Sequence, residues 1–297
     1  MSLPIRSRFP LWPIVLTGII AISFSAIFVR WSAAPVSVIA MYRLLLTACL
    51  MAPFAIRRMP AFRRLAAADW MWLLVSGLML GLHFLLWMAS LSHTTVASST
   101  AILTLEPILV LIGSFLLFRI KLPPLALAGM AIAIGGAGLI GWGDFGLSAA
   151  ALKGDLLSFL GTAAVAVHML IGKYAVARVS AFVYSFTVFL SAGLVLALYN
   201  AAAGYSFTDY PAAEWGNFLL LALVPTLLGH YLFNWLLGRM PATSVSMTVL
   251  GEPIGAGLLA WLLLGESITA LQAASGGLLL FGVWLFIRGR QHSVGSG

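Results

Sequence analysis

Long apolar runs, each close to the length of one membrane span and separated by short polar stretches, dominate the chain. Crossing a hydrocarbon core of about 30 Å takes roughly 20 apolar residues in a helix, whereas barrel strands would show alternating segments of about ten residues. The runs fit the first pattern and predict an all-α, polytopic membrane protein with ten transmembrane helices. We expect these spans near residues 11–30, 36–56, 70–91, 95–118, 124–142, 155–177, 181–203, 215–237, 242–264 and 269–287.

The composition agrees with this prediction. Of the 297 residues, 62% are hydrophobic and 8% are charged, and the mean hydropathy is +1.07. In a water-soluble domain about a quarter of all residues are charged. The surface of this chain must therefore face a lipid bilayer. The single cysteine, Cys49, lies in an apolar run without a partner and implies neither a disulfide nor a zinc site.

The basic residues are concentrated in alternate loops, which predicts an orientation. If the N-terminus lies inside, the inner loops carry Arg6, Arg8, Arg57, Arg58, Arg63, Arg64, Arg119, Lys121, Lys173, Arg178, Arg239, Arg288 and Arg290. The outer loops carry only Arg30 and Lys153, and Arg43 lies within a span. The positive-inside rule then places both termini in the cytoplasm. Nucleic acid is not an expected partner, because no basic patch is interleaved with aromatic residues in a soluble region.

Two short motifs, 146 residues apart, indicate an internal repeat. The sequence TLEPIL contains Glu106 and Pro107, and LGEPIG contains Glu252 and Pro253, each inside an apolar run. Aligning the two motifs also brings together residues in the neighbouring spans. Ser98 pairs with Ser244 within the same spans, and in the preceding spans Gly81 and Trp87 pair with Gly229 and Trp235 at a separation of 148.

The repeat predicts two domains of five spans each, residues 1–148 and 149–297. Because five is an odd number, the second copy enters the membrane from the opposite side. Inverted repeats of this kind occur in many secondary transporters, whose substrate sites lie near the midplane between the two halves.

The two glutamates lie near the middle of their spans, about 12 and about 10 residues from the span ends at 1.5 Å per residue. A central ionised acid is costly and must face the bundle interior or water. Pro107 and Pro253 each remove a backbone donor, which marks a discontinuous helix. Two interpretations stay open: Glu106 and Glu252 bind a substrate or proton, or they only support the broken turns.

Further polar residues share helix faces with these acids. Ser76, His83, Trp87 and Ser90 form one stripe, and Thr226, His230 and Asn234 form another. The predicted substrate site is His83, Trp87, Ser99, Glu106, His230, Asn234, Ser244 and Glu252. In the alternative, the hydroxyls and tryptophans pack helices and the histidines form interhelical hydrogen bonds.

Arg43, Pro107 and Pro253 are predicted to be structural or hinge residues. For Arg43, the other interpretation is an anchor for a substrate carboxylate or a partner for Glu106. His168 shares a stripe with Gly161 and Gly172, which indicates close helix approach.

The sequence lacks the motifs that are typical of several classes of enzyme and metal-binding protein. The sequence has no GxxxxGK[ST] phosphate loop, no HExxH, no CxxC and no acidic cluster with metal spacing. We therefore expect no enzyme, no catalytic residues, no cofactor and no metal. A membrane-embedded enzyme or a receptor is the remote alternative, and neither requires two inverted halves.

Three segments carry a resemblance to a known family. They are EPILVLIGSFLLF, EPIGAGLLAWLLLGESITALQAASGGLLLFGV and PVSVIAMYRLLLTA, the last with Arg43 at its arginine. The chain resembles the drug/metabolite transporter superfamily, EamA type, and most resembles the YddG-type bacterial exporters of aromatic and other neutral amino acids.

The resemblance implies a carrier of the bacterial inner membrane that exports a small molecule by alternating access, as a monomer or homodimer. The alternative within transport is a multidrug or quaternary-cation exporter, with Glu106 or Glu252 as its cation or proton site.

Overall fold

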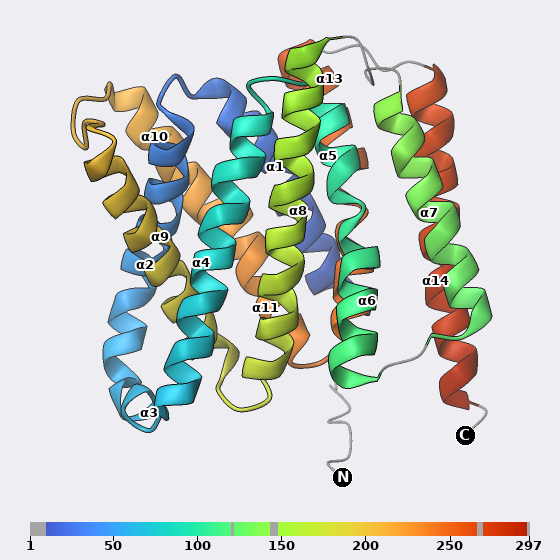
Figure 1. Ribbon diagram of the computed structural model, residues 1–297, viewed down its shortest axis with the longest axis horizontal. Helices are drawn as coiled ribbons and strands as arrows, with labels where there is room; N and C mark the ends of the chain where they lie inside the picture. The colour runs from blue at the N-terminus through green and yellow to red at the C-terminus, as the bar shows by residue number, and fades with distance from the viewer. Residues whose placement is uncertain (1–9, 120–121, 143–147, 266–269, 296–297) are drawn as a thin grey trace.

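The computed structural model describes residues 10–119, 122–142, 148–265 and 270–295, and every element of regular structure within them is a helix (Figure 1). The elements are α1 (Trp12–Trp31), α2 (Val36–Arg57), α3 (Met59–Arg63), α4 (Ala67–Ser90), α5 (Val96–Leu103), α6 (Glu106–Phe118), α7 (Pro124–Trp142), α8 (Ala149–Ala175), α9 (Ala181–Ala202), α10 (Ala212–Leu221), the π-helix η1 (Ala222–His230), α11 (Tyr231–Leu237), α12 (Ala242–Val249), α13 (Glu252–Leu264) and α14 (Ala270–Gly295).

Among the described residues, seven helical segments are long and apolar enough to cross a membrane by length and composition. They are α1, α2, α4, α8, α9, the segment from α10 to α11 and the segment from α12 to α13. Shorter apolar helices occupy 106–118, 124–136 and 273–289. The all-helical prediction is confirmed, and each expected range contains a helix, while the number of ten spans stays a prediction.

The packing of the helices repeats when the two halves are exchanged. α4 packs on α8 in the same way as η1 packs on α1, and α6 packs on α8 as α13 packs on α1. α2 and α9 pack against each other, and so do α7 and α14. Even a helix end is shared, since Arg119 after α6 and Gly265 after α13 both have positive φ, 52° and 71°. This recurrence supports the predicted repeat.

The pair α7 and α14 lies at one edge of the molecule (Figure 1) and packs closely through glycines. A Cβ atom added to Gly282 would lie 2.3 Å from the Ala133 nitrogen and 2.7 Å from the Gly129 carbonyl oxygen. Small residues let membrane helices approach closely, because without them the backbones are held apart. The glycines therefore define this interface.

Replacing Gly282 by alanine is expected to destabilise the protein by about 1–3 kcal/mol, because α7 and α14 must move apart to admit the methyl group. Gly277→Ala on the same helix is the matched control, since no described atom lies within 4 Å of its added Cβ. That change should be neutral or stabilising by up to about 1 kcal/mol. Thermal unfolding in detergent checks the pair, and equal melting temperatures for both variants would contradict the prediction.

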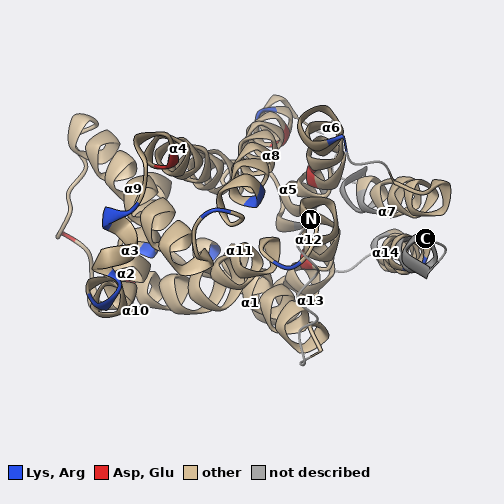
Figure 2. Cartoon of the chain, turned by 90° about the horizontal axis from the view of Figure 1, so that it is seen from below, with Lys and Arg blue, Asp and Glu red and all other residues tan. Residues whose placement is uncertain are grey.

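The two ends of the bundle carry opposite charge. α2, α6 and α8 end at the lower end in Figure 1, and Figure 2 shows Lys and Arg gathered there in the view from below. The described basic residues at these helix ends and in the adjoining connections are Arg57, Arg58, Arg63, Arg64, Arg119, Lys173, Arg178 and Arg239. Among the described residues, the upper end, where α8 and α10 begin, carries the acids Asp155, Asp209 and Glu214 and the basic residues Arg30 and Lys153. The charge asymmetry expected from the sequence is thus present between the two ends.

Candidate functional site

The two Glu-Pro pairs lie at breaks in their helices. α5 ends at Leu103 and α6 begins at Glu106, while α12 ends at Val249 and α13 begins at Glu252. The prolines occupy the second helical position, where the missing N–H removes no helical hydrogen bond. Each glutamate therefore lies at the positive end of a helix dipole, and the predicted discontinuous helices are confirmed.

A narrow cavity of about 40 Å³ lies beside these breaks. Its walls come from both halves of the chain: Ile22, Ser25, His83, Phe84, Trp87, Leu103, Glu106, Val165, His168, Met169, His230, Phe233, Asn234, Leu237, Val249 and Glu252. A single water needs about 10–15 Å³ of such space, so the cavity has room for a few waters and is too small for an amino acid. In this structure the cavity is therefore closed to a solute of that size.

Six of the eight predicted substrate-binding residues line this cavity: His83, Trp87, Glu106, His230, Asn234 and Glu252. Two do not. The Ser99 Oγ lies 2.6 Å from the Ser90 Oγ, in the contact between α4 and α5. Ser244 lines a separate groove between α1, α12 and α14. In the eighth span, His230 of η1 and Asn234 of α11 reach the wall, whereas Thr226 of the same predicted stripe binds Arg43. The hydroxyls of Ser99 on α5 and Ser244 on α12 face other helices.

The cavity wall follows the repeat. Leu103 and Val249 are 146 positions apart, as are Glu106 and Glu252. Ile22 with Val165 and Ser25 with His168 are pairs 143 positions apart, and His83 with His230 and Trp87 with Asn234 are pairs 147 positions apart. Equivalent positions of the two halves thus line one cavity, although most pairs differ in residue type.

His83 is held by the neighbouring helix α8. Its Nδ1 donates to the Gly161 carbonyl oxygen at 3.0 Å, since a carbonyl can only accept. Gly161 makes this approach possible, because an added Cβ would lie 3.2 Å from the His83 carbonyl oxygen and the Trp87 nitrogen. The ring of His83 stacks on Trp87 with 6.2 Å between centroids, and its centroid lies 6.4 Å from that of His230.

His168 also lines the cavity, which the sequence analysis did not predict. The Ser76 Oγ lies 2.8 Å from His168 Nδ1 and 2.7 Å from the Tyr184 hydroxyl. On the cavity side, Asn234 Nδ2 donates to the Ser185 Oγ at 3.2 Å. The glycine stripe on α8 suggested only helix packing, yet Ser76 on the facing stripe of α4 was a signal that a polar partner was needed. This network fixes the rings and amide at one side of the cavity.

Arg43 lies behind the cavity wall and is fully buried. Its Nε donates to the Thr226 Oγ1 at 3.0 Å and its Nη1 donates to the Ser25 Oγ at 3.0 Å. The guanidinium carbon lies 4.0 Å from the centroid of the Phe84 ring. These contacts bind α2 to α1, α4 and η1, which supports the structural interpretation of this residue.

The π-helix η1 sets which residues of its span reach the cavity. It contains Pro225, and the Thr47 Oγ1 on α2 shares its one O–H between the Arg43 carbonyl oxygen at 2.7 Å and the Ala222 carbonyl oxygen at 3.0 Å. π-helical turns are wider than α-helical turns and are frequent at functional sites. As a result, Asn234 lies in the wall as the counterpart of Trp87. The sequence alignment had paired Trp87 with Trp235, whose ring instead packs 3.3 Å from the guanidinium carbon of Arg239.

Two polar atoms of the wall are left without protein partners. Glu106 is 4% exposed and its Oε1 has no hydrogen-bond partner among the described residues. Trp87 is 2% exposed, and its Nε1 likewise meets no acceptor in the described part of the chain. Buried polar groups are normally paired, so this acceptor and this donor are available to a solute.

Comparison with known proteins identifies related sequences and folds. Residues 12–142 and 152–288 both match the model of the EamA-like transporter family. No match is found among curated proteins. A solved structure, described only as a crystal structure of a protein, has a TM-score of 0.76 and 18% identity over 94% of this chain and 97% of the other. At that identity the likeness concerns the fold alone.

Proposed function

The chain belongs to the EamA-like transporter family, and from that premise we propose that it moves an amino acid across the membrane by alternating access. The family belongs to the drug/metabolite transporter superfamily, whose members are multi-pass membrane transporters rather than enzymes. The proposal concerns the solute, the direction of transport and the mechanism.

The observation that carries the proposal is the chemistry of the cavity wall. Glu106 and Glu252 offer carboxylates to an ammonium group, while Trp87 Nε1 offers a donor to a carboxylate. The Asn234 amide has a second N–H besides the one that it donates to Ser185 Oγ. The rings of Phe84 and Phe233 provide an apolar surface for a side chain. A zwitterion with an aromatic or other neutral side chain uses all of these groups, whereas a bare inorganic ion uses few of them.

The closed cavity supports alternating access. It lies between the two halves, it is too small for the solute, and its walls are equivalent positions of a repeat. In our proposal the halves form an inverted repeat, and the helices that line the cavity move relative to one another so that it opens at one end at a time. The cavity is built from one chain, so the proposed working unit is the monomer, and a homodimer would contain two sites.

The proposed location is the bacterial inner membrane, with both termini cytoplasmic and with export as the physiological direction. The support is the basic lower end of the bundle, because loops rich in Lys and Arg remain on the cytoplasmic side. Labelling of single cysteines in the loops from either side of intact cells would test the orientation.

Counterflow in proteoliposomes tests the substrate. Vesicles preloaded with one unlabelled solute receive a trace of the same labelled solute, across a panel of neutral and aromatic amino acids and quaternary cations, with and without a proton gradient. We expect accumulation of neutral or aromatic amino acids. Accumulation of quaternary cations alone would overturn the amino-acid assignment in favour of the multidrug alternative, which the pair of acids beside aromatic rings also fits.

Alanine at His83 or Asn234 is expected to lower transport about tenfold, because each change removes a polar group of the wall worth about 1–1.5 kcal/mol in a hydrogen bond. Counterflow with purified variants measures the effect. Asn217→Ala is the matched control, since this buried amide donates to the Phe28 carbonyl oxygen at 2.7 Å, away from the cavity. Unchanged transport by the His83 and Asn234 variants would remove these residues from the site.

A further inference from the structure

A basic side chain ties the end of α1 to the other helices of its own half. At the upper end of the molecule, Arg30 lies in the last turn of α1, and its Nη2 donates to the Thr94 carbonyl oxygen at 2.9 Å. Thr94 belongs to the connection between α4 and α5. Both α1 and these two helices line the cavity, so this hydrogen bond joins helices of the cavity wall at the upper end.

The lower end carries a contact of the same kind. Lys173 lies in the last turn of α8, and its Nζ donates to the carbonyl oxygens of Leu237 and Met240 at 2.8 Å and 3.0 Å. These carbonyls lie at the end of α11 and in the connection to α12. The contact joins helices of the cavity wall at the lower end, opposite to that of Arg30.

The two contacts occupy equivalent positions of the repeat. Arg30 and Lys173 are 143 positions apart, like the cavity pair Ser25 and His168 on the same two helices. The acceptors Thr94 and Met240 are 146 positions apart, the separation of the two Glu-Pro motifs. Because the acceptors are backbone carbonyls, the residue types on that side are free to differ. An alignment of side chains therefore does not reveal the pair.

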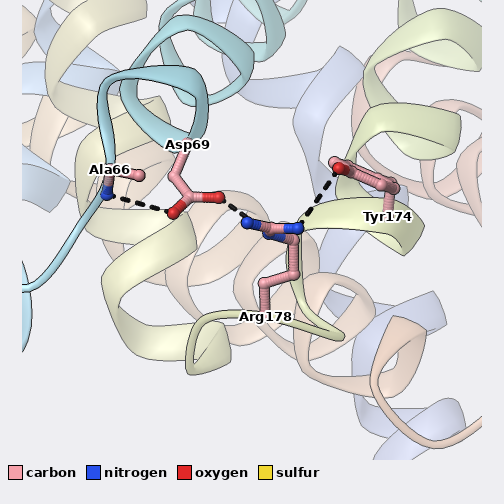
Figure 3. Close-up of polar contacts among 4 residues, drawn as sticks. All are labelled: Ala66, Asp69, Tyr174 and Arg178. Carbon is pink, nitrogen blue, oxygen red and sulfur yellow. Dashed lines mark hydrogen bonds and ion pairs between the residues drawn. The ribbon is translucent and has the colours of Figure 1, made fainter.

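A second pair of contacts repeats beside the first. Glu214, the third residue of α10, accepts from the Ser32 Oγ at 2.5 Å and from the Ala33 nitrogen at 2.6 Å. Asp69, the third residue of α4, accepts from Arg178 Nε at 2.8 Å (Figure 3). In each case an acid lies in the first turn of a helix of one half and accepts hydrogen bonds from the connection that follows the first span of the other half. These acids keep α1 and α8 anchored at the ends where the basic side chains act.

From this equivalence we propose that Arg30 and Lys173 are two latches that hold the cavity closed at its upper and lower ends. Release of the Arg30 hydrogen bond lets the cavity open at the upper end, and release of the Lys173 hydrogen bonds lets it open at the lower end. Both are positioning residues that do not touch the solute. The inference rests on the proposed alternating access and adds the residues that control each opening.

The latches differ in strength. Arg30 is exposed and uses one acceptor, whereas Lys173 is half-buried and uses two. Exposed charged contacts contribute less than buried ones because water competes for both partners. The upper end therefore opens more readily than the lower end in the absence of a solute.

Accessibility of a cavity residue tests the latches directly. In a Cys49→Ser background, Met169→Cys places a single thiol in the wall, on a residue with no polar role. A membrane-impermeant maleimide is added to right-side-out or inside-out vesicles, and the labelling rate is measured without solute. Arg30→Ala is expected to raise the labelling rate about threefold from the side of the upper end, because it removes one exposed hydrogen bond. Lys173→Ala is expected to raise the labelling rate about tenfold from the side of the lower end, because it removes two part-buried hydrogen bonds.

Two control variants keep the positive charge at positions 30 and 173, and a third removes a positive charge at another position. Arg30→Lys and Lys173→Arg should label nearly as the parent does, and Lys153→Ala removes an exposed upper-end charge that belongs to neither latch. Faster labelling of Arg30→Ala from the upper side and of Lys173→Ala from the lower side supports the proposal. Faster labelling from the same side, from both sides equally or not at all would overturn it, provided that the variants elute as monodisperse protein.

The latch proposal and the substrate proposal can be disproved independently of each other. If the side-specific labelling is observed but no amino acid shows counterflow, the latches stand and the substrate assignment falls. If amino-acid counterflow is observed and labelling is unaffected by either alanine, the transport function stands and the latches fall.

Discussion

Replacing Glu106 by glutamine is expected to raise the KM for the transported amino acid by about 10- to 100-fold in a protein that still folds. The Glu106 Oε1 lies in the cavity wall without a partner among the described residues. A charge-assisted hydrogen bond to a substrate ammonium is worth about 1.5–3 kcal/mol, and the amide keeps the shape of the side chain while removing the charge. Counterflow over a range of concentrations measures KM.

The controls for Glu106 separate its possible roles. Asp209→Asn neutralises an exposed acid in the connection before α10 and should leave KM unchanged. Loss of quaternary-cation transport with normal amino-acid transport in Glu106→Gln would favour the multidrug alternative. An unchanged KM for every solute together with lower stability would show that the acid only supports the break between α5 and α6.

Replacing Arg43 by alanine is expected to lower the free energy of unfolding by about 3–5 kcal/mol, the range for removing one partner of a buried charged network. The change leaves the hydroxyls of Thr226 and Ser25 without their donor and takes a cation from the face of Phe84. It also removes the cation that acts electrostatically on Glu252. Thermal and denaturant unfolding in detergent measure the loss.

Arg43→Lys should recover only part of this stability, because one ammonium cannot reproduce the two-pronged geometry and the stacking of a guanidinium group. Arg64→Ala is the matched control, since this arginine is exposed at the lower end of the molecule. A melting temperature for Arg43→Ala equal to that of the Arg64 variant would contradict the structural role. If Arg43→Ala folds normally and loses only substrate affinity, the anchor interpretation takes its place.

Features with a local cause were predicted well from the sequence. The length of an apolar run is enough to place a membrane helix, and a proline after a glutamate in such a run is enough to place a break, as at Pro107 and Pro253. The polar stripe of α4 was also read correctly, because an uninterrupted α-helix keeps its faces in register over many turns.

Features that depend on other helices were not predicted. Pro225 signals a disturbance in its span, but the sequence does not say whether this gives a kink or the π-helix η1, which packs against α1 and α2. The same limit applies to Ser244, which lines the groove between α1, α12 and α14 instead of the cavity. The cavity role of His168 follows from the approach of α4 and α8, which no single helical wheel contains.

The unequal pairs of the cavity wall have a kinetic consequence. Exact copies would give the inward- and outward-facing conformations the same energy and the same affinity, whereas Ser25 is the counterpart of His168 and Trp87 that of Asn234. Half-saturation concentrations measured from the two sides of the membrane should therefore differ. For a passive carrier, detailed balance nevertheless makes the quotient of maximal rate and half-saturation equal in both directions. Net export must then be driven by an ion gradient or by a higher solute concentration inside the cell, because an asymmetric binding site alone cannot rectify the flux.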